Sequence, residues 1–594
     1  MNEKRLHTAP EEIWRELQKA VDGLCMLHIR KSHSLIYDIA ICTLKLNIAI
    51  FPKLFDQCMI IFVLTLSLLF ILLFLSIKNI LMGVFDRFIQ KKVSLKSCRT
   101  TEGFNIGVAE AEGEANNSKI ALSEVFEDFL DVISQINNEK FIILGRKGSG
   151  KSAIGEHICH IASSDANIFA KFIRRTEIDI EHIVQIGISE GERIEQEMLF
   201  KWVVLTQELS LIVQNQNINH IKDISNLKKF IERNRGFINI EKREIKEIIH
   251  EKGININIEY FKRFYSSLFN RKIAIKEEKA AFYKLIPYLE ETISRILVSD
   301  PENSYILIFD DLDIGYYKSD KDISTLSELL RISKYYNNEL FGRNQLNSKI
   351  IVLLRNDIAK HLRFNADTAK IFASYAIELN WYEEMYRTQE DRLKLKQFIN
   401  KRIACNFEKN GLEYIKDKPW ESFVNEQEFA SFDNMGNTKS SFKYVIEHTF
   451  FRPRDLILFF KDIDRYKFPI PISRSNINNL IGRFANQIML EIQNELAAVF
   501  SEKEISITIN VLRAYRDKRT FTYESLRTDL ENCGLKDNAY DIIDELFFYS
   551  LIGNINHYGD VSFKFREKEG DICKVNPNEN LILHYVLKVY FKNN

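Results

Sequence analysis

The strongest constraint on the fold is one eight-residue segment, GRKGSGKS at residues 145–152. It follows the apolar run Phe141–Leu144, which predicts a buried strand, and Ala153 then opens a helical pattern. The segment fits G-x-x-x-x-G-K-[ST] at every position. Glycines let such a backbone curl until several N–H groups converge on phosphate oxygens, and the N-terminus of the following helix favours an anion. The alternative is a plain glycine turn between a strand and a helix.

This pattern predicts a site for a nucleoside triphosphate. Lys151 would reach the β- and γ-phosphates, and the Ser152 hydroxyl would bind Mg²⁺. We therefore predict ATP as the substrate and Mg²⁺ as the cofactor. The predicted nucleotide-binding residues are Gly145, Lys147, Gly148, Ser149, Gly150, Lys151, Ser152 and Ala153.

A second apolar strand with an acidic tip supplies a partner for the metal. Residues 304–309 (SYILIF) predict a buried strand, and Asp310 and Asp311 follow it. Ligands of open α/β sheets bind at the carboxyl ends of the strands. We predict Asp310 as the Mg²⁺ ligand, directly or through water, and Asp311 as the group that orients or deprotonates the attacking water. The alternative is a solvated turn after a strand.

A third apolar run, Lys349–Leu354, ends in Arg355 and Asn356. In P-loop ATPases with an additional strand, that strand lies between the first two and carries a polar sensor at its tip. Arg355 or Asn356 fits this place, and we assign Arg355 to the catalytic set. The alternative is a surface loop whose polar groups are satisfied locally.

The chain between the two predicted ligand strands is long. Lys151 and Asp310 are separated by far more than the roughly 30 residues that a βαβ unit needs, so a large insert is expected. Helical patterns such as Phe200–Gln214 and Lys279–Leu297 place a helical insert at about residues 199–298. This insert could contact a partner or a neighbouring subunit.

Two arginines flank a proline in the segment FRPRD at residues 451–455. Pro453 restricts the residue before it and can start a helix. Two guanidinium groups at that place could bind phosphate bidentately, so Arg452 and Arg454 are catalytic candidates. The alternative is an ion pair between an arginine and Asp455 at the start of the helix.

An apolar run near the N-terminus predicts a membrane span. Cys58–Ile77 contains no charged residue over twenty positions, enough to cross roughly 30 Å of hydrocarbon. The flank after the run carries more Lys and Arg than the flank before it, which places the C-terminal side in the cytoplasm. The run begins too far into the chain for a cleaved signal peptide. Residues 35–51 are expected to form an interfacial helix, or alternatively a second span.

The C-terminal residues 501–594 predict helices followed by a β-ribbon. Thr522–Leu530 and Ala539–Leu551 have helical patterns, whereas Gly553–His557 and Val561–Arg566 read as two strands. This order is typical of a winged helix, which often reads DNA through its later helix.

Charge disfavours nucleic acid as the partner of this region. The later helix carries Asp541, Asp544 and Glu545 without Lys or Arg, and residues 501–594 contain 13 Lys and Arg against 15 Asp and Glu. Such a surface repels phosphate. The whole chain also lacks a basic excess, with 82 basic and 82 acidic residues. We expect a protein-contact or autoinhibitory module.

The 8 cysteines are scattered and form no C-x-x-C pair. That spacing argues against a zinc ribbon and against a disulfide framework. It fits reduced thiols in a cytoplasmic body.

Three runs carry a family resemblance: ILGRKGSGKSAI (143–154), DDLD (310–313) and IIVLLRNDI (350–358). They resemble bacterial P-loop ATPases of the STAND and KAP-like kind, standalone ATPases often described near defence genes. Phe104–Glu114 resembles the entry to such a core, and residues 378–381 (ELNW) resemble the junction between sheet and lid.

The resemblance covers about residues 104–594. It implies that Arg452 and Arg454 belong to a lid motif that can approach the γ-phosphate. It also implies ATP hydrolysis coupled to conformational switching, often in oligomers and often in antiviral or stress responses.

These patterns together predict an α/β P-loop NTPase with an additional-strand parallel sheet. The expected domains are an N-terminal helical region (1–57), a transmembrane helix (58–85), a juxtamembrane linker (86–118), the ATPase core (119–385), a helical lid (386–500) and a winged-helix-like domain (501–594).

The predicted function is that of a single-pass bacterial inner-membrane ATPase with its catalytic domain in the cytoplasm. It would act as a switch in antiphage defence or stress signalling, as a homo-oligomer with a protein effector. One alternative is an ATP-binding oligomeric scaffold without significant turnover. Another is a nucleic-acid-dependent ATPase that acts through the winged helix.

Overall fold

The computed structural model describes residues 99–594, except residues 117–118, 175–195, 239–254, 311–319, 364, 384–388, 430–439, 498 and 567–574. The expected membrane span at residues 58–77 and the apolar stretch at 35–51 lie outside the described residues. Within the described part of the chain, no helix is both long enough and apolar enough to span a bilayer.

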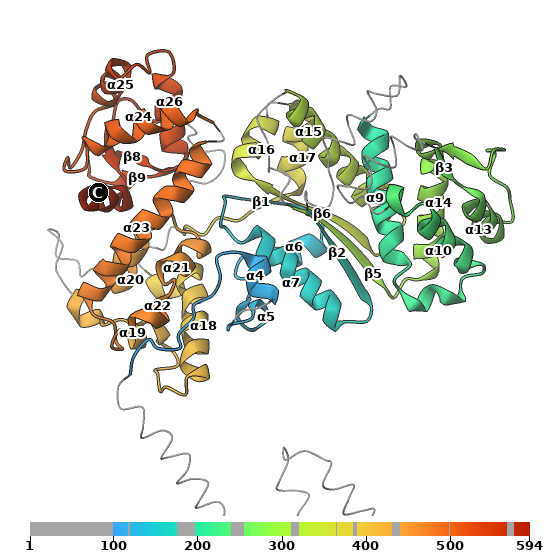
Figure 1. Cartoon of the computed structure of the whole chain (residues 1–594), viewed down its shortest axis with the longest axis horizontal. Helices are drawn as coiled ribbons and strands as arrows, with labels where there is room; N and C mark the ends of the chain where they lie inside the picture. Colours follow the sequence, from blue (N-terminus) through green and yellow to red (C-terminus); the bar gives the residue numbers. More distant parts are fainter. Residues whose placement is uncertain are drawn as a thin grey trace, which may run out of the picture. The chain divides into compact units, whose positions relative to one another are not determined.

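A five-stranded parallel sheet forms the centre of the fold (Figure 1), in the order β2-β5-β6-β1-β7. Its strands are rich in Ile, Leu and Val, as expected for parallel strands covered on both faces. Strand β6 lies between β1 and β5, which confirms the additional strand. The strands are β1 (Ile142–Gly145), β2 (Ile168–Arg174), β5 (Ser304–Asp310), β6 (Ser348–Arg355) and β7 (Ala376–Glu378).

Side chains alternate between the two faces of this sheet. Ile143 and Ile351 pack with α6 (Val132–Asn137) and α7 (Lys151–Ser164) on one face. Their neighbours Leu144 and Val352 pack on the other face. The helices of this second face are α9 (Gln196–Ile212), α14 (Ile286–Ser299), α15 (Asp320–Tyr335), α16 (Asn356–Leu362) and α17 (Ala366–Tyr375). The period of two in the strands therefore builds two separate cores.

The insert between β2 and β5 is mainly helical and shares the second core. Its helix α9 packs against β2, β5 and α14. The pair α10 (Ile224–Arg233) and α13 (Glu259–Phe269) packs together beyond α9 (Figure 1). The expected helix at Phe200–Gln214 corresponds to α9, with both ends shifted toward the N-terminus.

The prediction of a continuous helix over Lys279–Leu297 is wrong for the first part of this range. Lys279–Ala281 forms strand β4, which pairs antiparallel with β3 (Asn255–Asn257), and a 3-10 turn follows at Phe282–Leu285. The helix α14 begins only at Ile286. Pro287 lies in its first turn, where the missing N–H has no partner to lose, so the proline marks the helix start.

A helical region follows the sheet where the lid was expected, and it packs with the entry segment of the chain; we call this region the lid. Phe104 lies in the lid core, and the Glu114 carboxylate forms a buried bidentate pair with Arg402, with oxygen–nitrogen distances of 2.6 and 2.8 Å. Residues 100–116, assigned from sequence to a linker, therefore pack on the lid. The lid elements are α18 (Lys394–Lys409), α19 (Pro419–Phe423), α20 (Ser441–Ile446), α21 (Pro453–Phe459), α22 (Ile463–Tyr466) and α23 (Arg474–Leu496), whereas α4 (Ala111–Asn116) and α5 (Leu122–Val125) pack mainly against α7.

The C-terminal region holds three helices and then an antiparallel sheet of order β10-β8-β9. The ribbon β8–β9 was expected, but its strands are shorter than predicted, and the third strand β10 was missed. One hydrophobic core runs through the lid and this region. The elements are α24 (Glu502–Arg513), α25 (Tyr523–Asn532), α26 (Ala539–Phe548), β8 (Ile552–Ile555), β9 (Val561–Ser562), β10 (Asn580–Leu583) and α27 (Tyr585–Asn593), which packs along α23.

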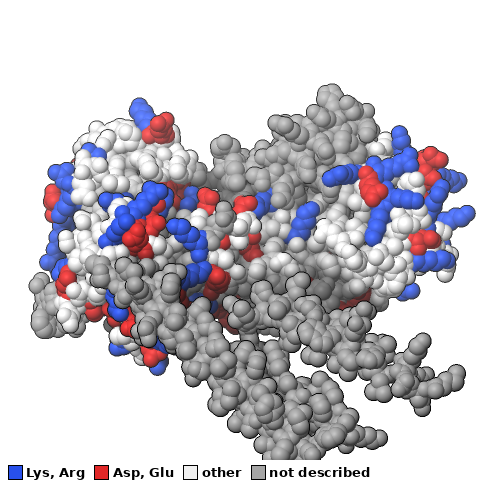
Figure 2. Space-filling model, turned by 60° about the horizontal axis from the view of Figure 1, so that its bottom comes forward, with Lys and Arg blue, Asp and Glu red and all other residues white. Residues whose placement is uncertain are grey.

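The exposed surface of the insert mixes both signs of charge (Figure 2). Lys229, Arg233 and Arg263 lie within 5.8 Å of the Tyr260 ring centre. Glu259 pairs with Arg233 and Arg263, at 3.9 and 2.5 Å. The α10–α13 surface is thus a network of neighbouring opposite charges in solvent.

One carboxyl group of the insert is fully enclosed. Glu208 of α9 is 0% exposed and accepts a hydrogen bond from Ser348 Oγ at the start of β6. Its second oxygen, Oε2, has no hydrogen-bond partner among the described residues. Burial raises the pKa of Glu208 to about 7, against a smaller opposing effect of Ser348. The folded chain therefore retains a proton here that the unfolded chain releases near its ordinary value of 4.5.

We expect Glu208→Gln to stabilise the protein selectively at alkaline pH. Between pH 4.5 and about 7 the folded state binds the extra proton, so the free energy of unfolding falls as pH rises through this window. The neutral amide of the variant would mimic the protonated carboxyl group at all pH values. At pH 8 the variant should gain on the order of 3 kcal/mol, at about 1.4 kcal/mol per pKa unit, with little difference near pH 4.5.

Denaturant unfolding of the full chain at both pH values measures this difference. Glu232→Gln, at an exposed position of α10, is the control and should show no pH-dependent gain. An equal gain at both pH values would contradict the proton linkage.

Candidate functional site

The phosphate loop joins the end of β1 to the start of α7. Gly148 and Gly150 have φ angles of 80° and 98°, a left-handed region that favours glycine. The Trp381 indole N–H donates to the Ser149 carbonyl at 2.8 Å, which ties the loop to the segment after β7. The loop thus has the strand before it and the helix after it that the motif requires.

The two predicted metal ligands meet at the loop. Ser152 Oγ donates to Asp310 Oδ2 at 2.6 Å, although the residues lie 158 positions apart. Lys151 Nζ donates to the carbonyls of Gly145 and Arg146, at 3.0 and 3.3 Å. A hydroxyl and a carboxylate in contact beside a phosphate loop are the oxygen donors that Mg²⁺ uses with substrate phosphates. The donor set therefore fits this cation.

A cavity of about 470 Å³ opens in front of the loop. All predicted loop residues except Gly145 line it, and Asp310 lies on the same wall. Apolar and aromatic side chains also line the cavity: Val108, Phe126, Phe129, Leu130, Trp381, Phe398 and Ile457. A cavity of this size that combines a loop for phosphates with apolar lining suits a nucleotide.

Two cationic side chains from strand ends also line the cavity. Arg355 ends β6, and its Nε donates to Asp357 Oδ1 at 3.0 Å. Arg174 ends β2 directly beside Asp310, and its Nη1 lies 3.2 Å from a Glu112 oxygen. Both strands end at the sheet edge where ligands bind.

The alternative sensor residue is placed differently. Asn356 does not line the cavity, and its Nδ2 donates to Glu378 Oε1 at 3.2 Å. Asp311, the predicted water-activating residue, lies outside the described residues. Its role stays a prediction.

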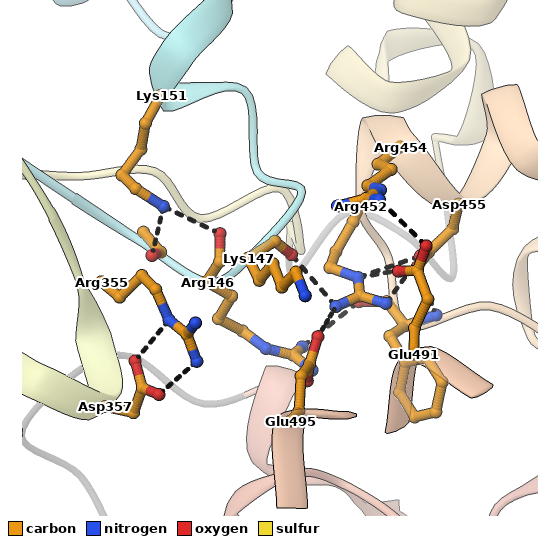
Figure 3. Close-up of polar contacts among 12 residues, drawn as sticks. Arg146, Lys147, Lys151, Arg355, Asp357, Arg452, Arg454, Asp455, Glu491 and Glu495 are labelled. Atoms are coloured by element: carbon orange, nitrogen blue, oxygen red, sulfur yellow. Dashed lines mark hydrogen bonds and ion pairs between the residues drawn. The ribbon is translucent and has the colours of Figure 1, made fainter. Parts of the chain in front are cut away.

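Arg452 lies behind the loop, outside the cavity lining. Its Nη2 is 2.8 Å from Asp455 Oδ1, and its Nη1 donates to the Lys147 carbonyl at 3.0 Å (Figure 3). Glu495 of α23 lies 3.3 Å from Nη1. Burial lowers the pKa of Arg452, but Asp455 and Glu495 outweigh it and raise the pKa above its ordinary value. The helix-start ion pair foreseen as the alternative is thus present for Arg452.

Arg454 lies on the cavity side of the same segment. It lines the cavity, and its backbone N–H donates to the Gly148 carbonyl at 3.3 Å. Its Nη2 is 3.0 Å from Glu491 Oε1. A Cβ placed on Gly148 would lie 2.9 Å from both Cβ and Cδ of Arg454, so the arginine stem requires a glycine there.

The sequence reasoning missed four charged residues around the loop: Arg146, Arg174, Glu491 and Glu495. Arg146 occupies an unspecified position of the motif, yet its Nη1 donates to the Phe450 carbonyl at 3.3 Å. Its guanidinium carbon lies 5.9 Å from the ring centres of Phe450 and Phe565. Burial, with Arg452 nearby, lowers the pKa of Arg146 to about 10. Of these four residues, only Arg174 could have been found from the sequence, because it is a polar residue at the end of a strand.

No model of a protein family matches the chain. A comparison with curated proteins finds no match either. Among solved structures, the ORC2 protein of Aeropyrum pernix in ADPNP–ADP complexes is similar at a TM-score of 0.26 and 11% identity, covering 78% of this chain and 91% of that chain. We draw no conclusion about fold or function from a match of this size.

We expect Gly148→Ala to weaken nucleotide binding at least tenfold. The new Cβ would strain a left-handed backbone, by roughly 1–3 kcal/mol, and would push against Arg454. Equilibrium titration with a fluorescent ATP analogue measures the loss. Gly411→Ala is the matched control, because it has a φ of 62° but nothing within 4 Å of an added Cβ. Wild-type affinity in Gly148→Ala would contradict the assigned packing.

Proposed function

We propose that this chain is a magnesium-dependent ATPase that uses nucleotide binding and hydrolysis as a conformational switch. The observation that carries the proposal is the 2.6 Å contact between Ser152 and Asp310 at the mouth of a glycine-rich loop. A hydrogen bond with a purely structural role rarely combines with such a loop, a cavity of nucleotide size and converging cations.

Each group of residues around the cavity has its own role in this function. Loop N–H groups and Lys151 bind the phosphate oxygens, and Ser152 with Asp310 holds Mg²⁺. When bound, the cation neutralises charge on the β- and γ-phosphates. Asp311, which follows Asp310 in the chain, deprotonates or orients the attacking water. Arg454 and Arg355, which both line the cavity, stabilise negative charge on the terminal phosphate.

The lid gives this chemistry a mechanical output. Arg454 belongs to the lid, whereas Lys151 and Asp310 belong to the sheet and the helix that follows its first strand. A ligand that contacts both parts favours their approach, and loss of the terminal phosphate releases one of the contacts. Occupancy by ATP closes the lid, and hydrolysis or exchange opens it.

The C-terminal region serves this switch as a protein-contact module with a winged-helix arrangement. Three helices before a three-stranded antiparallel sheet support that assignment. Its later helix α26 faces the core: Lys360 of α16 lies 3.4 Å from Glu545 and 4.4 Å from the Phe548 ring centre. An acidic helix engaged in this way favours an internal contact over reading of nucleic acid.

We place the switch at the bacterial inner membrane, with one span at residues 58–77 and the ATPase in the cytoplasm. The charge-free run and the basic flank after it support this placement. The chain acts in antiphage defence or stress signalling, as a homo-oligomer with an effector protein. The family resemblance of the loop, the acidic strand and the lid segment supports this role.

Phosphate release from ATP by the purified full chain tests the function. Wild type should turn over only with Mg²⁺, and Lys151→Ala should bind ATP at least tenfold more weakly because the main phosphate cation is lost. Asp311→Asn should retain ATP affinity while turnover falls by about 10²–10⁴, the usual contribution of a general base.

Asp541→Asn, an exposed aspartate on α26, is the control and should match wild type. Normal turnover in Asp311→Asn would remove the role assigned to that residue. ATP binding without phosphate release in wild type would favour the non-hydrolysing scaffold.

A further inference from the structure

Helix α23 presents two glutamates on one face, one turn apart. Glu491 and Glu495 have the i, i+4 spacing that aligns side chains along a helix. Glu491 pairs with Arg454 at 3.0 Å, and Glu495 pairs with Arg452 at 3.3 Å. Each glutamate therefore pairs with one of the two arginines that flank Pro453 (Figure 3).

The two pairs do different things. Arg452 also binds Asp455 and the Lys147 carbonyl, so its guanidinium is committed to holding the loop from behind. Arg454 instead lines the cavity, and Glu491 does not. The arginine therefore stands between the Glu491 carboxylate and the space in front of the loop.

The pair of Arg454 and Glu491 retains unused hydrogen-bonding capacity. Among the described residues, Arg454 Nε and Glu491 Oε2 are buried without a hydrogen-bond partner. Burial raises the pKa of Glu491, while Arg454 and Arg452 act in the opposite direction. The carboxylate thus depends on these arginines for its charge.

Other contacts already fix most of Arg454. Its backbone N–H donates to the Gly148 carbonyl, and its stem occupies the space that a Cβ on Gly148 would need. The guanidinium group is the part that would otherwise sample many rotamers, since a free arginine side chain carries about 2 kcal/mol of rotamer entropy. Glu491 is the carboxylate that holds this group.

We propose that Glu491 is the positioning residue for Arg454, and that it holds the guanidinium at the cavity wall for the terminal phosphate of a bound triphosphate. The proposal rests on the proposed nucleotide function. A charge that is fixed before the reaction needs no reorganisation when negative charge develops. Glu491 acts through Arg454 alone, without touching the nucleotide.

A double-mutant cycle with Glu491→Ala and Arg454→Ala in the full chain tests this dependence. Glu491→Ala should lower kcat and the preference for ATP over ADP, the latter roughly tenfold, the loss of about one charge-assisted hydrogen bond. In the Arg454→Ala background, the same change should have almost no further effect. Glu491→Gln retains an acceptor oxygen and should recover part of both quantities.

A merely structural role gives a different pattern. If Glu491 only stabilised α23, its removal would lower the unfolding free energy and activity equally in both backgrounds, which would overturn the proposal. Asn494→Ala, exposed on the same helix, should leave kcat and the ATP preference unchanged. An unchanged ATP preference in Glu491→Ala would also overturn the proposal.

Two readouts separate this inference from the function on which it rests. If wild type binds ATP but releases no phosphate, hydrolysis fails as a function, whereas the ratio of ADP to ATP Kd values across the four chains of the cycle still decides the role of Glu491. Absence of all nucleotide binding in wild type would overturn both.

Discussion

The contact between Ser152 and Asp310 organises the rest of the structure. Asp310 ends β5, whereas Ser152 lies in α7, the helix after β1, and β6 separates β1 from β5 in the sheet. Neighbouring strands are about 4.8 Å apart, so a side chain on β1 itself would be too far from the tip of β5. The first turn of α7 crosses this gap above β6. The position of the helix start, set by the curled loop, therefore brings the hydroxyl to the carboxylate.

A second constraint acts on the outer side of the loop. Three consecutive loop residues, Arg146, Lys147 and Gly148, contact the segment from Phe450 to Arg454 through hydrogen bonds. The cations gathered there are balanced by Asp455, Glu491 and Glu495. Unpaired buried charges would destabilise the fold strongly. Because Arg452 and Arg454 find these acids within the lid itself, their charges stay paired when the lid moves relative to the loop.

Local patterns predicted much of this fold. The sequence predicted the loop, the acidic strand and the inserted strand β6, because short apolar runs that end in polar residues indicate buried strands. The pairing of Ser152 with Asp310 followed from their places at one sheet edge. The structure, rather than the sequence, shows that Arg355 lines the cavity and Asn356 does not, because side chains of successive residues point in different directions.

The missed features depend on contacts between distant segments. Nothing near Glu491 or Glu495 in the sequence distinguishes them from other helical glutamates, and their partners lie on another helix. The orientation of Arg452 away from the cavity results from Asp455 and the Lys147 carbonyl together. Strand β10 is short and follows a loop, so its pairing with β8 is a tertiary effect.

Because of Arg146, truncation of the C-terminal region would alter the phosphate loop. The guanidinium carbon of this loop residue lies 5.9 Å from the ring centres of both Phe450 of the lid and Phe565 of the C-terminal region. A cavity of only about 10 Å³ remains beside it, lined also by Glu495 and Tyr549. A chain shortened before residue 501 would lose Tyr549 and Phe565 and would hydrate this cation. The truncated protein would then have a phosphate loop with altered electrostatics. A change in its nucleotide affinity would arise partly from the hydration of Arg146 and partly from other effects of the missing region.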